Sequence, residues 1–128
     1  MDSILRTGVG LGVLLTLAAC VTAPQSVRER EAYWREILAE RTPVGAPKSQ
    51  VAALFTEYQL PMAEGTYRTA LPDGGQSSNC RLPDRAVSAI ERGAVRGLYI
   101  KWDIEVTVCL DERDTVESHF VGAWNAGI

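Results

Sequence analysis

The chain has 128 residues, which is enough for one compact domain and too few for two ordinary ones. Its 13 basic and 16 acidic residues give a formal net charge of -3, so the basic surface of a nucleic-acid-binding protein is not expected. Hydrophobic residues make up 46% of the chain and charged residues 23%, which is typical of folded soluble domains and excludes a disordered chain.

The first twenty residues have the composition of an export signal. No residue between Arg6 and Arg28 is charged, and residues 9–19 are almost wholly apolar with small side chains at the end. A membrane-spanning helix needs about 20 predominantly apolar residues, whereas this apolar run stops at Val21. We therefore predict a signal peptide over residues 1–19. A retained inner-membrane helix and a plain secretory signal with an incidental cysteine remain the alternatives.

The apolar run ends in Leu17-Ala18-Ala19-Cys20, and these four residues resemble the lipobox of bacterial lipoproteins. The resemblance implies cleavage before Cys20, a diacylglycerol on the Cys20 thiol and acylation of the new amine. One acyl chain holds a protein marginally, whereas two or three anchor it stably. Because Val rather than Asp stands at position 21, the resemblance implies the outer membrane, with the inner membrane as the alternative. Residues 20–25 would then form a lipidated tether, and residues 26–128 a single periplasmic domain.

Cys80 and Cys109 are the two cysteines of this mature domain. Because the compartment beyond the inner membrane is oxidising, we expect them to form one disulfide. The bridge would close a loop of about 30 residues, for which the chain-entropy model gives about 3.6 kcal/mol. Two buried, unpaired thiols are the alternative if the chain stays in the cytosol. No Cys-x-x-Cys spacing indicates a redox site.

Two helices are predicted at the start of the mature domain. Ser26 and Glu29 have the spacing of a capping box, and the helix that they open should run to about Arg41. Pro47 is well placed as the first residue of a second helix, which must end by Leu60 because a proline follows. Apolar residues at helical spacing line one face of each helix: Val27, Tyr33, Trp34, Ile37 and Leu38 in the first, and Val51, Leu54, Phe55 and Tyr58 in the second.

The middle of the chain is less regular. Residues 66–71 are expected to form a short strand, which a Pro-Asp-Gly-Gly turn closes. Residues 76–83 are polar and predict a loop around the first of the two paired cysteines. Residues 84–92 are expected to form one or two helical turns that end at Gly93.

The strongest periodic signal is an alternation of apolar and mostly polar residues over 98–110. It predicts one long strand that is buried on one face and wet on the other, with Cys109 on the wet face. Residues 111–114 should form a turn, and residues 115–121 should return as the hairpin partner. Residues 124–128 are left as a short tail.

This order of elements predicts an α+β fold in which two N-terminal helices pack on one face of a small antiparallel sheet of about three strands. The order, with the segment GAPKSQVAALF before the sheet and the hairpin VTVCLDERDTVESHFV, resembles the small outer-membrane lipoproteins of the SmpA/OmlA (BamE-like) group over residues 45–121. The chain departs from that group where Leu60-Pro61-Met62 stands in place of Gly-x-Pro. No partner-binding residue is therefore carried over.

The candidate chemistry is sparse. His119 is the only histidine, and no Gly-x-Ser-x-Gly elbow accompanies it. One histidine and two bridged cysteines leave no ligand set for a transition metal, so no metal and no cofactor are predicted. Asp103 and Glu105 have a spacing that glycosidase carboxylates could use, but Lys101 beside them favours a charge-balanced solvent face.

Surface recognition remains as the expected function. Tyr99 on the polar face of the long strand and Trp124 in the tail are the candidate protein-binding residues, because exposed aromatic residues are enriched in interfaces. We expect a lipid-anchored envelope protein that binds another envelope protein, without catalysis, a nucleic acid or a small-molecule substrate. One alternative is an inhibitor or immunity-type lipoprotein that blocks an envelope hydrolase or toxin. The other is a hydrolase that uses Asp103, Glu105 or His119.

Overall fold

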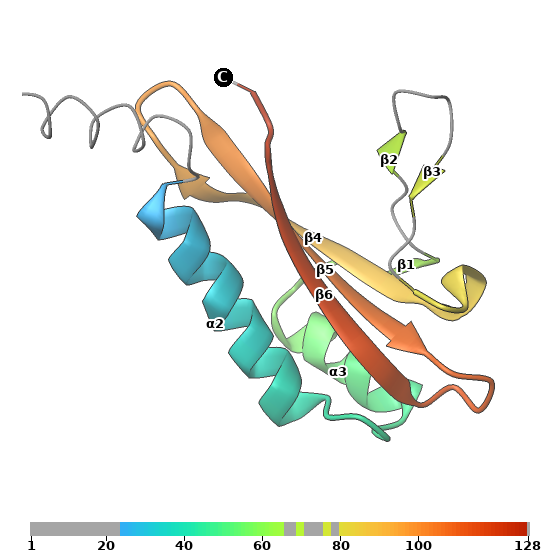
Figure 1. Cartoon of the computed structure of the whole chain (residues 1–128). Coiled ribbons are helices and arrows are strands. Elements are labelled where there is room, and N and C mark those ends of the chain that lie inside the picture. The colour runs from blue at the N-terminus through green and yellow to red at the C-terminus, as the bar shows by residue number, and fades with distance from the viewer. Residues whose placement is uncertain (1–23, 66–68, 71–75, 78–79, 128) are drawn as a thin grey trace, which may run out of the picture.

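The computed structural model describes residues 24–65, 69–70, 76–77 and 80–127 (Figure 1). The predicted signal peptide and the predicted lipidation site at Cys20 lie outside these residues. Among the described helices, none has the length and apolar character needed to cross a membrane.

Both predicted helices are present. Helix α2 spans Gln25–Arg41 and helix α3 spans Lys48–Glu57. The predicted capping box is wrong, because α2 begins two residues early: Pro24 is the N-cap and Ser26 lies inside the first turn, where no side chain caps the helix. Pro47 likewise stands just before α3 rather than in its first position.

The described strands form two antiparallel sheets. The larger sheet has the order β1-β4-β5-β6, with the short β1 (Ala63–Glu64) beside three long strands, and the smaller sheet pairs β2 with β3. These long strands are β4 (Val87–Arg96), β5 (Lys101–Leu110) and β6 (Val116–Asn125), and the two short ones are β2 (Thr69–Ala70) and β3 (Gln76–Ser77). The α+β class and the antiparallel sheet are confirmed, but the larger sheet has four strands where about three were expected, and neither β1 nor β4 was predicted as a strand. Of the strand predicted over residues 66–71, only Thr69–Ala70 lies within the described residues, and it belongs to the smaller sheet as β2.

The prediction for residues 84–92 is wrong. Only Pro83–Arg85 is helical, as the 3₁₀ turn η1, and the chain then enters β4. Val87 and Ala89 point into the core, whereas the residues between and after them point to the other face, so this segment has the alternation of a strand. A short apolar run of this kind fits a helix or a strand, and pairing with β5 decides between the two.

The predicted long strand starts three residues late. β4 and β5 pair as far as Arg96 and Lys101, and Gly97 donates its backbone N–H to the carbonyl of Ile100 at 2.7 Å. Leu98 and Tyr99 therefore lie in the turn of the β4–β5 hairpin, where 89% and 71% of their surfaces are exposed. The alternation of apolar and polar residues in the sequence extends into this turn, so it placed the start of the strand too early.

The second hairpin is confirmed and is longer than predicted. Asp111 anchors its turn, because its carboxylate accepts hydrogen bonds from the backbone N–H groups of Arg113 and Thr115 and from the Thr115 hydroxyl. These bonds hold the pKa of Asp111 below its ordinary value. β6 then continues to Asn125, so Trp124 belongs to a strand rather than to a tail.

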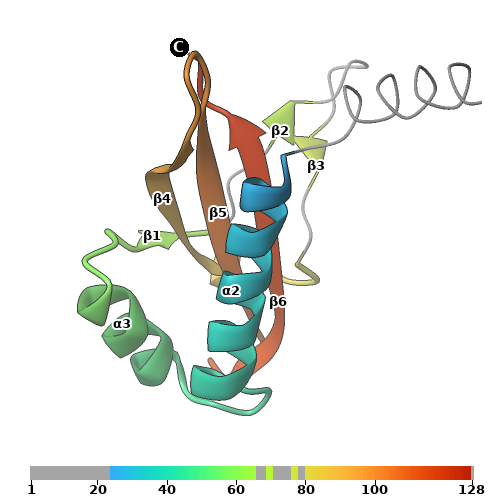
Figure 2. The ribbon, with the colours of Figure 1, turned by 90° about the vertical axis from the view of Figure 1, so that its left-hand side faces the viewer.

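Both helices cover one side of the larger sheet (Figures 1 and 2). The even-numbered residues of β5 face them, and one apolar core joins the two layers. Tyr33 was expected on the buried stripe, but it is exposed and packs under the Arg30 guanidinium, 4.3 Å from its ring centre. The largest buried side chains are Trp34, Phe55, Leu38, Leu54, Ile104 and Leu110.

The predicted disulfide joins Cys80 to Cys109, with 5.4 Å between their Cα atoms. It lies on the side of the sheet away from the helices, as expected, but it is not on a wet surface. Both cysteines are buried and form a small second core with Ala86. The chain segment around Cys80 and η1 packs over this end of the sheet, and that packing could not be inferred from the alternation in β5 alone.

Candidate functional site

The sheet has a face that neither α2 nor α3 covers, and the segment with Cys80 and η1 packs over only one end of it. We call it the open face, and strand register defines it. Glu105 of β5 lies between Ile90 of β4 and Gly122 of β6, and Thr107 lies between Ser88 and Phe120. Asp103 and Trp124 form the next pair toward the β4–β5 hairpin. The open face thus consists of Ser88, Ile90, Asp103, Glu105, Thr107, Phe120, Gly122 and Trp124. Ser88, Asp103 and Thr107 are buried within it, so its accessible side chains are those of Ile90, Glu105, Phe120 and Trp124.

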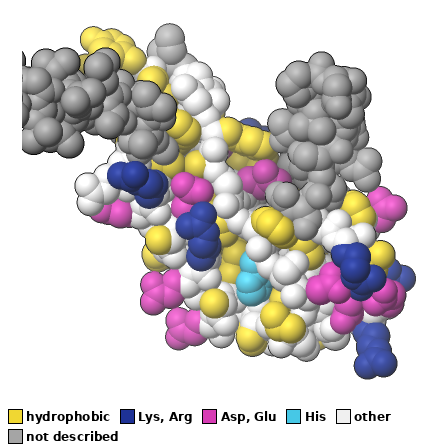
Figure 3. Space-filling view, in the orientation of Figure 1, with side chains coloured by type: hydrophobic (Ala, Val, Ile, Leu, Met, Phe, Trp, Pro, Cys, Tyr) yellow, Lys and Arg dark blue, Asp and Glu magenta, His cyan; other side chains and the backbone are white. Residues whose placement is uncertain are grey.

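The open face carries apolar and aromatic side chains. Phe120 is 38% exposed, and Ile90 and Trp124 are half-buried. Glu105, Thr107, Phe120 and Gly122 line a small hollow of about 70 Å³. A Cβ atom added at Gly122 would meet nothing within 4 Å, so the space opposite Glu105 is open. In Figure 3, apolar side chains gather where β6 crosses the middle of the molecule, with an acidic group among them.

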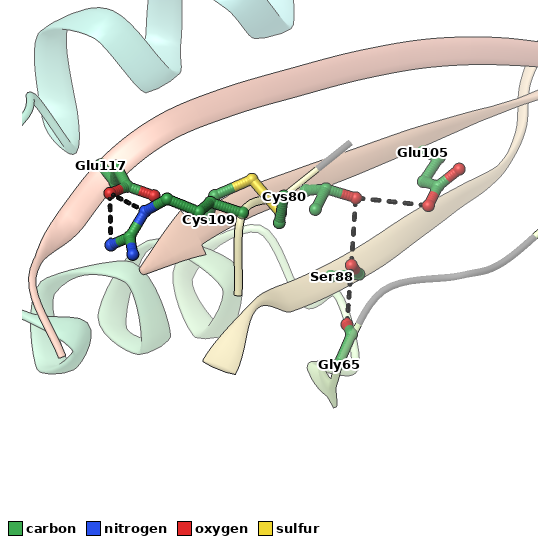
Figure 4. Close-up of a disulfide and its surroundings, with 8 residues drawn as sticks. Gly65, Cys80, Ser88, Glu105, Cys109 and Glu117 are labelled. Atoms are coloured by element: carbon green, nitrogen blue, oxygen red, sulfur yellow. Dashed lines mark hydrogen bonds and ion pairs between the residues drawn. A yellow bond between two sulfur atoms is a disulfide. The ribbon is translucent and has the colours of Figure 1, made fainter. Parts of the chain in front are cut away.

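A chain of three polar contacts crosses the open face (Figure 4). Glu105 Oε1 lies 3.3 Å from Thr107 Oγ1, which lies 3.0 Å from Ser88 Oγ, which lies 3.1 Å from the carbonyl oxygen of Gly65. The two hydroxyls supply two protons for three contacts, and a carbonyl supplies none. All three contacts are hydrogen bonds at once only if Glu105 is protonated. Burial raises the pKa of the Glu105 carboxyl above its ordinary value, which favours that state.

Asp103 does not lie in a solvent face, which corrects the prediction from the neighbouring lysine. Its exposed fraction is 6%, and its Oδ1 atom accepts the backbone N–H of Gly93 at 2.7 Å. Its other oxygen lies 3.6 Å from the guanidinium of Arg92. These contacts hold the irregular part of β4 between Glu91 and Val95, where the register with β5 shifts. Asp103 is therefore a structural group at a β-bulge.

The three residues of the hydrolase alternative do not converge. Asp103 and Glu105 point to the open face, whereas His119 lies across from Val108 on the helix side of the sheet. There the His119 Nε2 atom donates to the carbonyl oxygen of Thr42 at 2.6 Å, at the end of α2. The sheet itself separates the imidazole from both carboxylates. Within the described part of the chain, no group of three or more His, Cys, Asp or Glu side chains could hold a metal ion.

The charged cluster that joins α2 to β4 is structural. Glu91 receives hydrogen bonds from the Arg30 guanidinium and, at 3.2 Å, from the indole N–H of Trp34. Burial acts to raise the pKa of Glu91, but these bonds outweigh it and hold the pKa below the ordinary value. At the other end of the sheet, Arg81 binds Glu112 and Glu117. Figure 4 shows Glu117 and its contacts beside the disulfide.

The two predicted recognition residues occupy different places. Tyr99 lies at the apex of the β4–β5 hairpin with Leu98 and Ile100, and we call these three residues the hairpin tip. Trp124 lies on the open face with Ile90 and Phe120. The structure does not bring Tyr99 and Trp124 into one site. Ile90 and Phe120 were missed because the first was placed in a helix and the second in a strand whose exposed side was not assigned.

No family model matches the chain, and neither a curated protein nor a solved structure is similar to it. The residues themselves must therefore support any functional assignment.

Proposed function

We propose that this protein is held to the bacterial outer membrane by lipid at Cys20 and binds another envelope protein through the open face, without catalysis. The lipobox-like sequence Leu17-Ala18-Ala19-Cys20 supports the anchor. The buried Cys80–Cys109 bridge agrees with an oxidising compartment, because disulfides are rare where thiols are kept reduced. The separation of His119 from the two carboxylates argues against joint catalysis by these residues.

The observation that carries the binding proposal is the open face itself. It places Ile90, Phe120 and Trp124 together on a sheet surface, and aromatic residues there supply contact area at small entropic cost. The half-buried Glu105 beside them is a polar group that can fix the orientation of a partner. A protein surface that combines these features is typical of an interface.

The edge of β6 offers a second contact. Among the described residues, the backbone of positions 45–47 pairs with the first end of β6, and no strand pairs with its outer edge beyond Val116. Edge strands are commonly protected by lysine or proline, and the sequence VESHFVGAWN contains neither. A partner segment that added a strand here would place its side chains next to Phe120 and Trp124.

Site-specific photocrosslinking in cells tests this proposal. A photoreactive residue at position 120 should yield one covalent adduct with an envelope protein, whereas the same residue at position 36, exposed on α2, should not. The lack of an adduct at position 120, or the same adducts at both positions, would contradict the proposal. If the adduct contains a hydrolase or a toxin whose activity the protein inhibits, the inhibitor alternative holds.

A further inference from the structure

The β4–β5 hairpin ends in an apolar tip with nothing described packed over it. Leu98 is 89% exposed, Tyr99 71% and Ile100 44%, so all three residues leave apolar surface in water. They stand in sequence between Gly97 and Lys101 at the apex of a turn, and no core position requires them there. Consecutive exposed apolar residues at a loop apex need a partner or a membrane to cover them.

The hairpin tip lies at the end of the domain where α2 begins (Figures 1 and 2). Pro24 and Ser26, at the start of α2, line one open groove of about 470 Å³ together with the residues of the tip. Apolar side chains are visible at this end of the molecule in Figure 3. The opposite end of the sheet carries the disulfide and the Arg81 cluster instead.

The chain outside the described residues limits where the membrane can be. Four residues lead from Cys20 to Pro24, and an extended chain spans at most about 3.6 Å per residue. A lipid on Cys20 is therefore attached within about 14 Å of the start of α2. Since the tip shares a groove with Pro24, anchoring at Cys20 brings the tip to the bilayer surface.

The charge around the tip fits an anionic lipid surface. Residues 92–101 contain Arg92, Arg96 and Lys101 and no acidic residue, although the whole chain has a net charge of -3. Arg96 and Lys101 face each other across the base of the hairpin, and they line a hollow of about 230 Å³ together with Arg92. The carboxylate of this hollow, Asp103, is already bound to Gly93 and Arg92. Cations next to a short apolar and aromatic segment are typical of interfacial membrane contacts.

We propose that the hairpin tip inserts into the headgroup region of the anionic bilayer that carries the lipid anchor. Leu98, Tyr99 and Ile100 enter the interface, and Arg96 and Lys101 bind lipid phosphates. This inference rests on the proposed anchor at Cys20. The anchor supplies a high effective concentration, so the tip needs little affinity of its own. Its contact would fix how the domain stands on the membrane and would leave the open face free for a protein partner.

Tryptophan quenching by brominated lipid tests the proposal on the full, membrane-purified protein. Tyr99→Trp and the control Arg113→Trp, at the exposed turn of the opposite hairpin, are reconstituted in vesicles of brominated phosphatidylcholine with phosphatidylglycerol. After subtraction of the wild-type emission, the signal from position 99 should shift to shorter wavelength and lose intensity. The signal from position 113 should do neither. In the Tyr99→Trp protein, Leu98→Ser with Ile100→Ser should abolish the loss, and omitting phosphatidylglycerol should reduce it.

Flotation with the vesicles and the intact mass of the protein report the anchor separately. If the acylated protein floats but position 99 is not quenched, or is quenched no more than position 113, the tip proposal is wrong and the anchor stands. If no acyl mass is found, the proposed anchor itself is wrong and the tip proposal falls with it. A dimer in detergent that Leu98→Ser dissociates would show that a second copy covers the tip, which would also overturn the proposal.

Discussion

Glu105 provides the sharpest test of the open-face geometry. Three polar contacts link Glu105 to Thr107, Thr107 to Ser88, and Ser88 to the carbonyl oxygen of Gly65. When the Glu105 carboxylate is ionised, only the two hydroxyls carry protons, so one of these three contacts cannot be a hydrogen bond. The substitution Glu105→Gln removes the charge and supplies N–H donors at the same position. We expect this variant to satisfy all three contacts at every pH, whereas the wild-type side chain does so only when it is protonated.

The expected gain is about 1 kcal/mol, which is the net value of one intramolecular hydrogen bond. Its pH dependence follows from the raised pKa of Glu105, whose cause is burial. A carboxyl with a raised folded-state pKa stabilises the fold fully below its unfolded pKa of about 4.3, and this contribution is lost as pH rises through the folded pKa. The stability difference between Glu105→Gln and wild type should therefore be small near pH 4 and reach its full value above the folded pKa.

Urea unfolding followed by tryptophan fluorescence measures both free energies across this pH range. The control is Glu91→Gln, because the pKa of Glu91 is lowered and its contribution has the opposite sign. That contribution is present above about pH 4.3 and is lost as pH falls through the folded pKa, so Glu91→Gln should destabilise at pH 7 by about 1.5–3 kcal/mol and less in acid. A Glu105→Gln protein less stable than wild type at pH 7, or a difference that does not change with pH, would refute the reasoning.

Reduction of the disulfide and two further variants test the bridge, the core and the β4–β5 hairpin. Reduction of the Cys80–Cys109 disulfide should cost about 3.6 kcal/mol, the entropy of a loop of about 30 residues, and a melting temperature unchanged by reductant would contradict this. Trp34→Ala should cost about 3–5 kcal/mol, because the indole is fully buried, and calorimetry checks the loss. Gly93→Ala should destabilise by about 1–2 kcal/mol, since Gly93 has φ +60°, and a stability equal to wild type would show that the bulge relaxes.

The local pattern was enough to predict the helices and the second hairpin. Helical spacing from Val51 to Tyr58 and a proline beyond it left little choice for α3, and Asp111 begins a turn by local bonds alone. The pairing of Cys80 with Cys109 followed from elimination, since the third cysteine, Cys20, is the predicted lipidation site. These features depend on neighbours within a few residues or on the count of one residue type.

The errors arose where a distant segment decides the outcome. The alternation over 98–110 does not record that the chain reverses at Gly97, because the reversal depends on β4 pairing with β5. In the same way, the segment that became β4 has too few apolar residues to separate a helix from a strand. Of the candidate site residues, Tyr99 and Trp124 were correctly predicted as exposed or partly exposed aromatic residues. Their places in the fold were predicted wrongly, because Tyr99 lies in a turn rather than a strand and Trp124 in a strand rather than a tail.

From its sequence alone, this protein is an α+β domain with two amphipathic helices, a C-terminal antiparallel hairpin and one possible disulfide, because these follow from periodicity, turn chemistry and cysteine number. Tertiary structure alone decided which face of the sheet stays open, that Asp103 is buried at a bulge, and that Glu105 joins a chain with two protons for three contacts. It also placed the hairpin tip beside the start of α2. Each of these depends on residues that are far apart in the chain and meet only when the strands pair and the helices pack.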